Sequence, residues 1–214
     1  LVMLAAGVLG LLVGIYAGGH WDTWLAYVYA TPFGTRDPIL GYDVGFYVFT
    51  FPLLEMLRSL LLLVVFVGGA ASLAAYVLGG EIGLDPIRGL LTSRAAVRDI
   101  SILGAALLLV LGFGAWLQIP QLLTTPSGAV FGASYTDVHA RMPALRVLVA
   151  ASFVGAGLAL WQMRVARYWP SVMAIGLYIL VSVAGVAYAS VIQRFVVAPN
   201  EQVRETPFIT HNIQ

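Results

Sequence analysis

The sequence predicts an all-α polytopic membrane protein, a transmembrane helix bundle of five spans with short interfacial helices. Three observations predict this fold class. The 214 residues are 60% hydrophobic and 10% charged, whereas a soluble domain has about 25% charged residues. The mean hydropathy is +0.92. Apolar runs near the roughly 20 residues that a helix needs to cross a bilayer recur along the chain.

The composition also excludes several classes of function. The chain has no cysteine, which excludes disulfides, thiol nucleophiles and thiolate metal sites. All 11 basic residues are arginines, so there is no lysine for Schiff-base chemistry. A net charge of +1 gives no indication of nucleic-acid binding. We therefore expect a lipid bilayer as the environment, no nucleic-acid partner and no cofactor.

Five apolar segments are the expected spans, and the first is short. The second span is long, so its first turns are expected at the membrane interface. Before it, the spacing of Trp21, Trp24 and Tyr27 predicts a short amphipathic helix in the headgroup region, where indole and phenol rings are favoured. The spans are residues 2–18, 47–78, 100–117, 144–162 and 170–192.

The arginines predict the orientation of these spans. Two connections, after the second and fourth spans, are richest in arginine, and the positive-inside rule places them in the cytoplasm. The loops after the first and third spans and the C-terminal segment then lie outside. The arginines of the two cytoplasmic connections are Arg88, Arg94, Arg98, Arg164 and Arg167.

The central turns of the expected spans contain no ionisable residue, although such residues usually mark function in a membrane. Glu55 and Arg58 lie three residues apart near the outer end of the second span. Their spacing predicts a local interfacial ion pair, with a gate or substrate contact as the alternative. The three histidines lie outside the spans, which excludes a haem held between two intramembrane histidines.

Small residues at four-residue spacing predict close helix packing on two of the spans. In lipid, helices associate through such stripes because their backbones can approach closely. The first span carries Gly10, Gly14 and Gly18, and the fourth carries Ala151, Gly155 and Ala159.

The two outer loops are rich in turn formers and aromatic residues. In the first, Asp37 and Asp43 stand among prolines and glycines that let the loop double back, and Ca²⁺ ligation is an alternative role for both carboxylates. In the second, we expect a short helix capped by Thr136 or Asp137 and ended by Met142–Pro143. Asp137 and His139 do not share a helix face, so they make a poor metal pair and no metal site is expected.

The C-terminal segment has two prolines and no helical stripe, which predicts an extended lead-in to a soluble domain. We therefore divide the chain into a transmembrane domain, 1–193, and the start of an extracytoplasmic domain, 194–214. The outer loops are expected to form a docking surface for that domain or for a protein partner. Its expected residues are Arg36, Asp37, Asp43, Tyr135, Asp137, His139 and Glu201.

Three ordered motifs connect the chain to a known family. They are FG-x-x-DP-x-x-x-x-D-x-x-FYVF-x-x-P at 33–52, GASYTDVHARMPA at 132–144, and the exit F-x-V-x-PNE…E-x-P-F-I-x-x-NI, in which Phe208 stands where tyrosine is common. The chain resembles the large bacterial membrane proteins of uncharacterised protein family 0182. The resemblance implies about seven spans before a large extracytoplasmic domain, of which this chain would hold the last five and the first outer residues. It also implies a bacterial inner-membrane location with an extracytoplasmic C-terminus, and it implies no activity.

Three functions are compatible with these patterns. The first is a membrane anchor and docking scaffold for an extracytoplasmic domain or a larger membrane or envelope complex. The second is a transporter or channel component whose pathway involves further N-terminal spans. The third is an enzyme at the outer surface. No nucleophile–base spacing can be identified among its candidate acids and bases, so we expect no catalysis. Those candidates are Asp37, Asp43, Asp137, His139 and Glu201.

Overall fold

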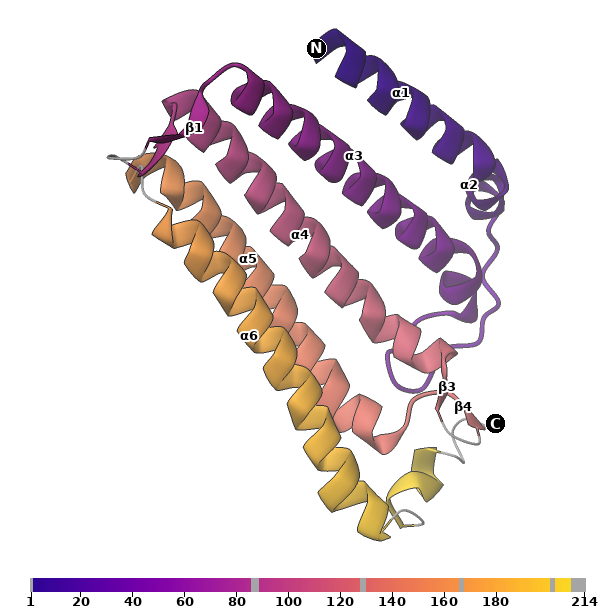
Figure 1. Ribbon diagram of the computed structural model, residues 1–214. Helices are drawn as coiled ribbons and strands as arrows, with labels where there is room; N and C mark the ends of the chain where they lie inside the picture. The colour runs from indigo at the N-terminus through magenta and orange to yellow at the C-terminus, as the bar shows by residue number, and fades with distance from the viewer. Residues whose placement is uncertain (1, 86–88, 128–129, 166–167, 201–202, 209–214) are drawn as a thin grey trace.

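The computed structural model is an antiparallel bundle of long helices (Figure 1). Helices α3 (Phe51–Leu78), α4 (Arg94–Thr124) and α5 (Met142–Val165) lie side by side in chain order, and α6 (Trp169–Ile192) packs against α5. Helix α1 (Val2–Gly19) runs along α3 at the edge of the bundle. The predicted all-α class is confirmed. The structure describes residues 2–85, 89–127, 130–165, 168–200 and 203–208.

Four helices in the described part of the chain are long and apolar enough to cross a membrane, whereas five spans were predicted. The first expected span is the exception, because its apolar described stretch, Ala6–Gly19, is too short. Continuous helix extends the other expected spans, most of all α4, which begins six residues before the predicted 100. Ser93 explains that early start, since its hydroxyl accepts a hydrogen bond from the Ala96 N–H at 3.0 Å and caps the helix.

Three π-helical turns extend the long helices at one end of the bundle. They are η1 (Phe46–Thr50) before α3, η2 (Asp137–Arg141) before α5, and η3 (Gln193–Val197) after α6. The prediction that Met142–Pro143 ends a short separate helix is wrong, because η2 continues directly into α5. The chain widens into a π-helical turn just before Pro143, where the proline ring and its missing N–H are accommodated.

Short elements connect the helices. Helix α2 (Trp21–Val28) matches the predicted amphipathic stretch, and η4 (Ala198–Asn200) follows η3. At the end of the bundle where α3 meets α4, a hairpin pairs β1 (Ile82–Asp85) with β2 (Gly89–Thr92). At the other end, β3 (Pro126–Ser127) pairs with β4 (Val130–Phe131). We call that second end, which holds residues 29–45, 125–127, 130–141, 193–200 and 203–208, the loop end.

The tightest packing lies between α4, α5 and α6. A core of Ala105, Leu108, Ala156, Ala159 and Ala174 joins the three helices. A Cβ added at Gly155 would lie 3.2 Å from Leu108 Cδ1 on α4 and 3.5 Å from the Ala174 carbonyl oxygen on α6. The small residues Ala151, Gly155 and Ala159 are all buried, so the stripe predicted on this helix lies at the contact with its neighbours.

The stripe on α1 has a different environment. Gly10, Gly14 and Gly18 are exposed, and a Cβ added to any of them would meet no atom within 4 Å. Within the described residues, this stripe therefore packs against nothing.

The outer surface of the bundle is strongly apolar. On α6, Val172, Leu180 and Val186 are 66%, 67% and 68% exposed. A continuous apolar surface of this kind is unfavourable in water and matches the hydrocarbon of a bilayer. The fold is therefore that of a membrane protein, with its polar contacts gathered at the helix ends.

Candidate functional site: the loop end

The carboxylates of Asp37 and Asp43 shape the loop between α2 and α3. Asp43 Oδ1 accepts hydrogen bonds from the backbone N–H groups of Phe33 at 3.0 Å and Gly45 at 2.7 Å, and Oδ2 accepts one from Gly34 at 2.9 Å. Asp37 accepts from the N–H groups of Ile39 and Leu40 and from the Tyr47 hydroxyl. Both carboxylates therefore act as internal braces that close turns of the loop.

The hydrogen bonds to Asp43 also change the pKa of its carboxyl group. The N–H groups of Phe33 and Gly45, with that of Gly34 and the charge of Arg36, hold the pKa of Asp43 below its ordinary value, although partial desolvation acts in the opposite direction. The charged form is the one that accepts the three hydrogen bonds. The loop is therefore most firmly closed when Asp43 is ionised.

Glycine is required at one position in this loop for reasons of space. A Cβ at Gly45 would lie 2.9 Å from Asp43 Oδ1 and 3.1 Å from the Thr31 carbonyl oxygen. Gly34 and Gly41 have φ of +76° and +74°, which residues other than glycine rarely adopt. The turn formers of this loop thus have the structural role that the sequence predicted.

The second loop begins η2 with a reciprocal cap. The Ser134 N–H donates to Asp137 Oδ2 at 2.9 Å, and the Asp137 N–H donates to the Ser134 hydroxyl at 3.2 Å. This is a capping box, so Ser134 is the cap and the predicted caps Thr136 and Asp137 are wrong. Asp137 is 2% exposed and its Oδ1 binds Arg141 Nη1 at 2.8 Å.

The C-terminal segment docks on this second loop. In its described residues this segment is helical, with η3, η4 and a further helical turn at 203–208, which corrects the predicted extended conformation there. Residues 201–202 and 209–214 lie outside the described ranges. Glu205 Oε2 accepts a hydrogen bond from the Tyr135 N–H at 3.1 Å. Arg204 lies over the Tyr135 ring, with its Cζ 5.3 Å from the ring centroid.

Aromatic rings complete that contact. His139 stacks on Tyr135 with ring centroids 4.1 Å apart, and Phe208 meets both rings edge-on at 5.9 and 6.0 Å. The Thr136 hydroxyl donates to the Gln193 side-chain oxygen. We call Tyr135, His139, Arg204, Glu205 and Phe208 the tail clasp.

The two loops lie next to each other at the end of α4. A cavity of about 270 Å³ is lined by Asp37 and Tyr47 from the first loop and its helix, by Leu123 and Thr124 at the end of α4, and by Ala133 from the second loop. The two halves of the predicted docking surface are therefore adjacent. Arg36 pairs by backbone with Asp43 in an isolated bridge, and the remaining predicted member, Glu201, lies outside the described residues.

The candidate acids and bases of the loop end do not form one cluster. Asp37 and Asp43 bind donors of their own loop, whereas Asp137 binds Ser134 and Arg141. In the described ranges, no group of three or more histidine, aspartate or glutamate side chains is placed to hold a metal ion.

The predicted ion pair of Glu55 with Arg58 is not formed; the ion pairs of the described chain join Arg98 to Asp99 and Arg141 to Asp137. Arg58 instead reaches α4, where a Cβ at Gly114 would lie 2.5 Å from its Nε. That Nε is buried and has no hydrogen-bond partner. A pattern search on one helix misses this contact, because the space for Arg58 is made by a glycine on another helix.

The tail clasp was also only partly visible in the sequence. Tyr135 and His139 were expected in the docking surface, and their four-residue spacing puts them on one helix face. Arg204, Glu205 and Phe208 were expected only as extended chain. A possible signal was the E-x-P-F run itself, which combines a charge and an aromatic ring in an otherwise polar segment.

The family model and the similar proteins indicate the same family. Residues 1–214 match the family described as "Uncharacterised protein family (UPF0182)". A "UPF0182 protein" of Trichlorobacter lovleyi is 36% identical over 99% of this chain, and another from Kineococcus radiotolerans is 38% identical over 99%. The chain spans only 24% and 21% of those two relatives. No solved structure matches.

Proposed function

The chain belongs to the uncharacterised protein family UPF0182, and we propose that it is a membrane anchor and docking scaffold for an extracytoplasmic domain or a larger membrane or envelope complex. The observation that carries this proposal is the tail clasp, which ties the C-terminal segment to the loop that precedes α5. A scaffold needs a defined exit from the membrane, and this contact fixes the direction in which the chain leaves the bundle.

The arginine distribution supports an orientation for the scaffold. The connections between α3 and α4 and between α5 and α6, with the helix ends beside them, carry Arg88, Arg94, Arg98, Arg164 and Arg167, which favours their placement in the cytoplasm of a bacterial inner membrane. The loop end then faces outward with the C-terminus. In that arrangement the domain 1–193 anchors the protein, and 194–214 begins the extracytoplasmic part.

The first test is purification of the full-length protein in a gentle detergent, followed by mass spectrometry of everything that migrates with it. Stoichiometric partner subunits, or an outer domain that remains protected from protease on the bundle, are expected. A lone protein whose outer part is digested as fast as a free linker would contradict the scaffold.

The tail clasp gives this test a specific variant. Tyr135→Ala removes a ring contact, a cation–π contact and the stack with His139, which together contribute about 1–2 kcal/mol. Limited proteolysis near 200–209 in the full-length protein should become about 5- to 30-fold faster. Tyr29→Ala is the matched control, because Tyr29 is a 74% exposed loop tyrosine away from the clasp. Equal rates in both variants would remove the support that the clasp gives.

A transporter or channel component is the second candidate, and Arg58 favours it. A charged side chain packed between two spanning helices, with a buried unpartnered Nε, is unfavourable in a membrane and usually has a function. Further N-terminal spans would complete the pathway. Ion flux through proteoliposomes of the full-length protein that is lost in Arg58→Leu and kept in Arg164→Leu would establish this function over the scaffold.

A further inference from the structure

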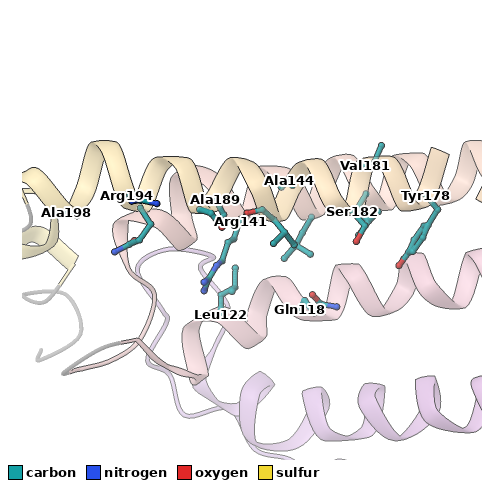
Figure 2. Close-up of a pocket in the computed structure, with 16 residues that line it drawn as sticks. Gln118, Leu122, Arg141, Ala144, Tyr178, Val181, Ser182, Ala189, Arg194 and Ala198 are labelled. Carbon is teal, nitrogen blue, oxygen red and sulfur yellow. Dashed lines mark hydrogen bonds between the residues drawn. The ribbon is translucent and has the colours of Figure 1, made fainter. Parts of the chain in front are cut away.

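A side groove runs along the bundle between α4 and α6, beside α5 (Figure 2). Its volume is about 700 Å³, which is in the range of sites for small organic ligands. Tyr178, Ser182 and Gln118 line its deeper part, and Arg141 and Arg194 line the part at the loop end.

The two arginines come from different segments and lie next to helix ends. Arg141 directly precedes α5, and Arg194 follows the end of α6 by two residues. Both therefore stand where an apolar helix reaches the membrane surface. Figure 2 shows the two side chains at the same end of the groove.

Asp137 positions the guanidinium of Arg141, and the side chain remains largely exposed. Its Nη1 binds Asp137 Oδ1 at 2.8 Å, and Asp137 is itself held by Ser134. The Arg141 side chain is nevertheless 57% exposed. Arg194 is exposed and, within the described residues, has no ion pair or side-chain hydrogen bond. Two arginines at one end of a groove favour a phosphate group, which accepts several N–H bonds at once.

Below the arginines, the groove has no further charged side chain among its lining residues, and aliphatic side chains stand beside the polar groups of Gln118, Tyr178 and Ser182. Leu145 and Leu148 from α5 and Val181 and Val186 from α6 line it. Sixteen residues separate Tyr178 from Arg194, which corresponds to ~24 Å of helix. Half of a bilayer core is ~15 Å thick, so the groove spans a headgroup and most of one acyl layer.

We propose that this groove is a binding site for an anionic glycerophospholipid of the leaflet at the loop end, with its phosphate between Arg141 and Arg194 and an acyl chain along α6. Charge complementarity distinguishes this occupant from others. A zwitterionic lipid would gain less from the two arginines, and a soluble anion would leave the apolar length of the groove unfilled. The proposal does not depend on the scaffold function.

The test is made on the full-length protein in nanodiscs and in detergent. Wild-type protein is reconstituted with equal amounts of phosphatidylglycerol and phosphatidylcholine, extracted gently, and its retained lipids are counted by native mass spectrometry. We expect retained phosphatidylglycerol to exceed phosphatidylcholine at least about fivefold, because one arginine near a membrane surface changes anionic lipid binding by about that factor. Arg194→Gln should lower the ratio about fivefold, and Arg194→Lys should keep most of it.

Two further variants make the test specific. Arg164→Gln removes an exposed arginine at the opposite end of α5 and should leave the ratio unchanged. Ser182→Trp fills the apolar part without touching the arginines, so it should lower retention of the whole lipid. Circular dichroism and gel filtration establish that each variant is folded.

Three results would overturn the proposal. The first is equal retention of the two lipids by the wild-type protein. The second is an Arg194→Gln protein that keeps the wild-type ratio. The third is displacement by millimolar inorganic phosphate together with no effect of Ser182→Trp, which would identify a site for a free anion instead of a lipid.

Discussion

The glycine stripe of α1 and the small-residue stripe of α5 have the same spacing in the sequence but opposite surroundings in the fold. An added Cβ at Gly155 would meet Leu108 and Ala174, whereas an added Cβ at Gly14 would meet nothing within 4 Å. A stripe of small residues allows another helix to pack closely against it. Whether that packing occurs depends on the presence of a neighbouring helix. The same contrast divides the molecule into a tightly packed α4–α5–α6 unit and a more open α1–α3 edge.

The largest effect is expected at the buried stripe. Gly155→Leu would force α4 and α6 away from α5 and should lower the free energy of unfolding by about 2–3 kcal/mol. Gly14→Leu, with the same change in volume, should change it by less than about 0.5 kcal/mol in the 214-residue chain. Thermal unfolding in one detergent compares the two variants. Similar losses of stability in both variants would contradict the difference between the stripes of α5 and α1.

A substitution at Gly112, where α4 meets α5, should cause a smaller loss of stability, and a second substitution should reverse it. A Cβ there would lie 2.7 Å from Ser152 Cβ, so Gly112→Ala should cost about 1–2 kcal/mol. Adding Ser152→Gly removes the clashing atoms and should restore most of the lost stability. A double-mutant cycle measures this coupling. Simple additivity of the two changes would show that the helices do not meet as described.

Gly114, two residues along the same helix, should respond more weakly. An alanine Cβ there would meet the Arg58 Nε at 2.5 Å, but this neighbour is a flexible side chain. We expect Gly114→Ala to cost about 1 kcal/mol or less, and the cost to disappear in an Arg58→Leu background. Unfolding of the single and double variants checks this. A cost as large as that of Gly112→Ala would mean that α3 holds Arg58 rigidly.

The smallest effect is expected in the loop between α2 and α3, which belongs to the more open edge of the bundle. Hydrogen bonds to Asp37 and Asp43 hold the conformation of this loop. The pKa of Asp43 is lowered in the folded loop, so its stabilising contribution is complete above the unfolded pKa of ~4 and is lost as the pH falls through the lower folded pKa. Hydrogen exchange at the Phe33, Gly34 and Gly45 amides should therefore accelerate on acidification below about pH 4, beyond the intrinsic pH dependence of exchange. Amides in α5 should show no such excess, and Asp43→Asn should remove the pH response of the loop.

The helices were largely predictable because hydropathy depends on composition over a window. For α6, residues 170–192 were predicted and Trp169–Ile192 are helical. For α4, 100–117 were predicted and Arg94–Thr124 are helical, because hydropathy detects the part that crosses lipid while Ser93 sets where the helix begins. The loop carboxylates were identified as candidates, but their partners were not. Asp43 binds Phe33 ten residues away, and Tyr135 binds Glu205 seventy residues away.

The sequence alone determined that this protein is an apolar helix bundle, where the central parts of its four long apolar helices lie, and which segments gather the polar chemistry. Those properties follow from the cost of placing polar groups in hydrocarbon, which each segment carries in its own composition. Tertiary structure decided which small-residue stripe is buried. It also decided that Arg58 lies against α4 instead of pairing with Glu55, and that the C-terminal segment contacts Tyr135. Each of these depends on a residue from another helix or loop, and contacts between distant segments are set by packing that no local pattern contains.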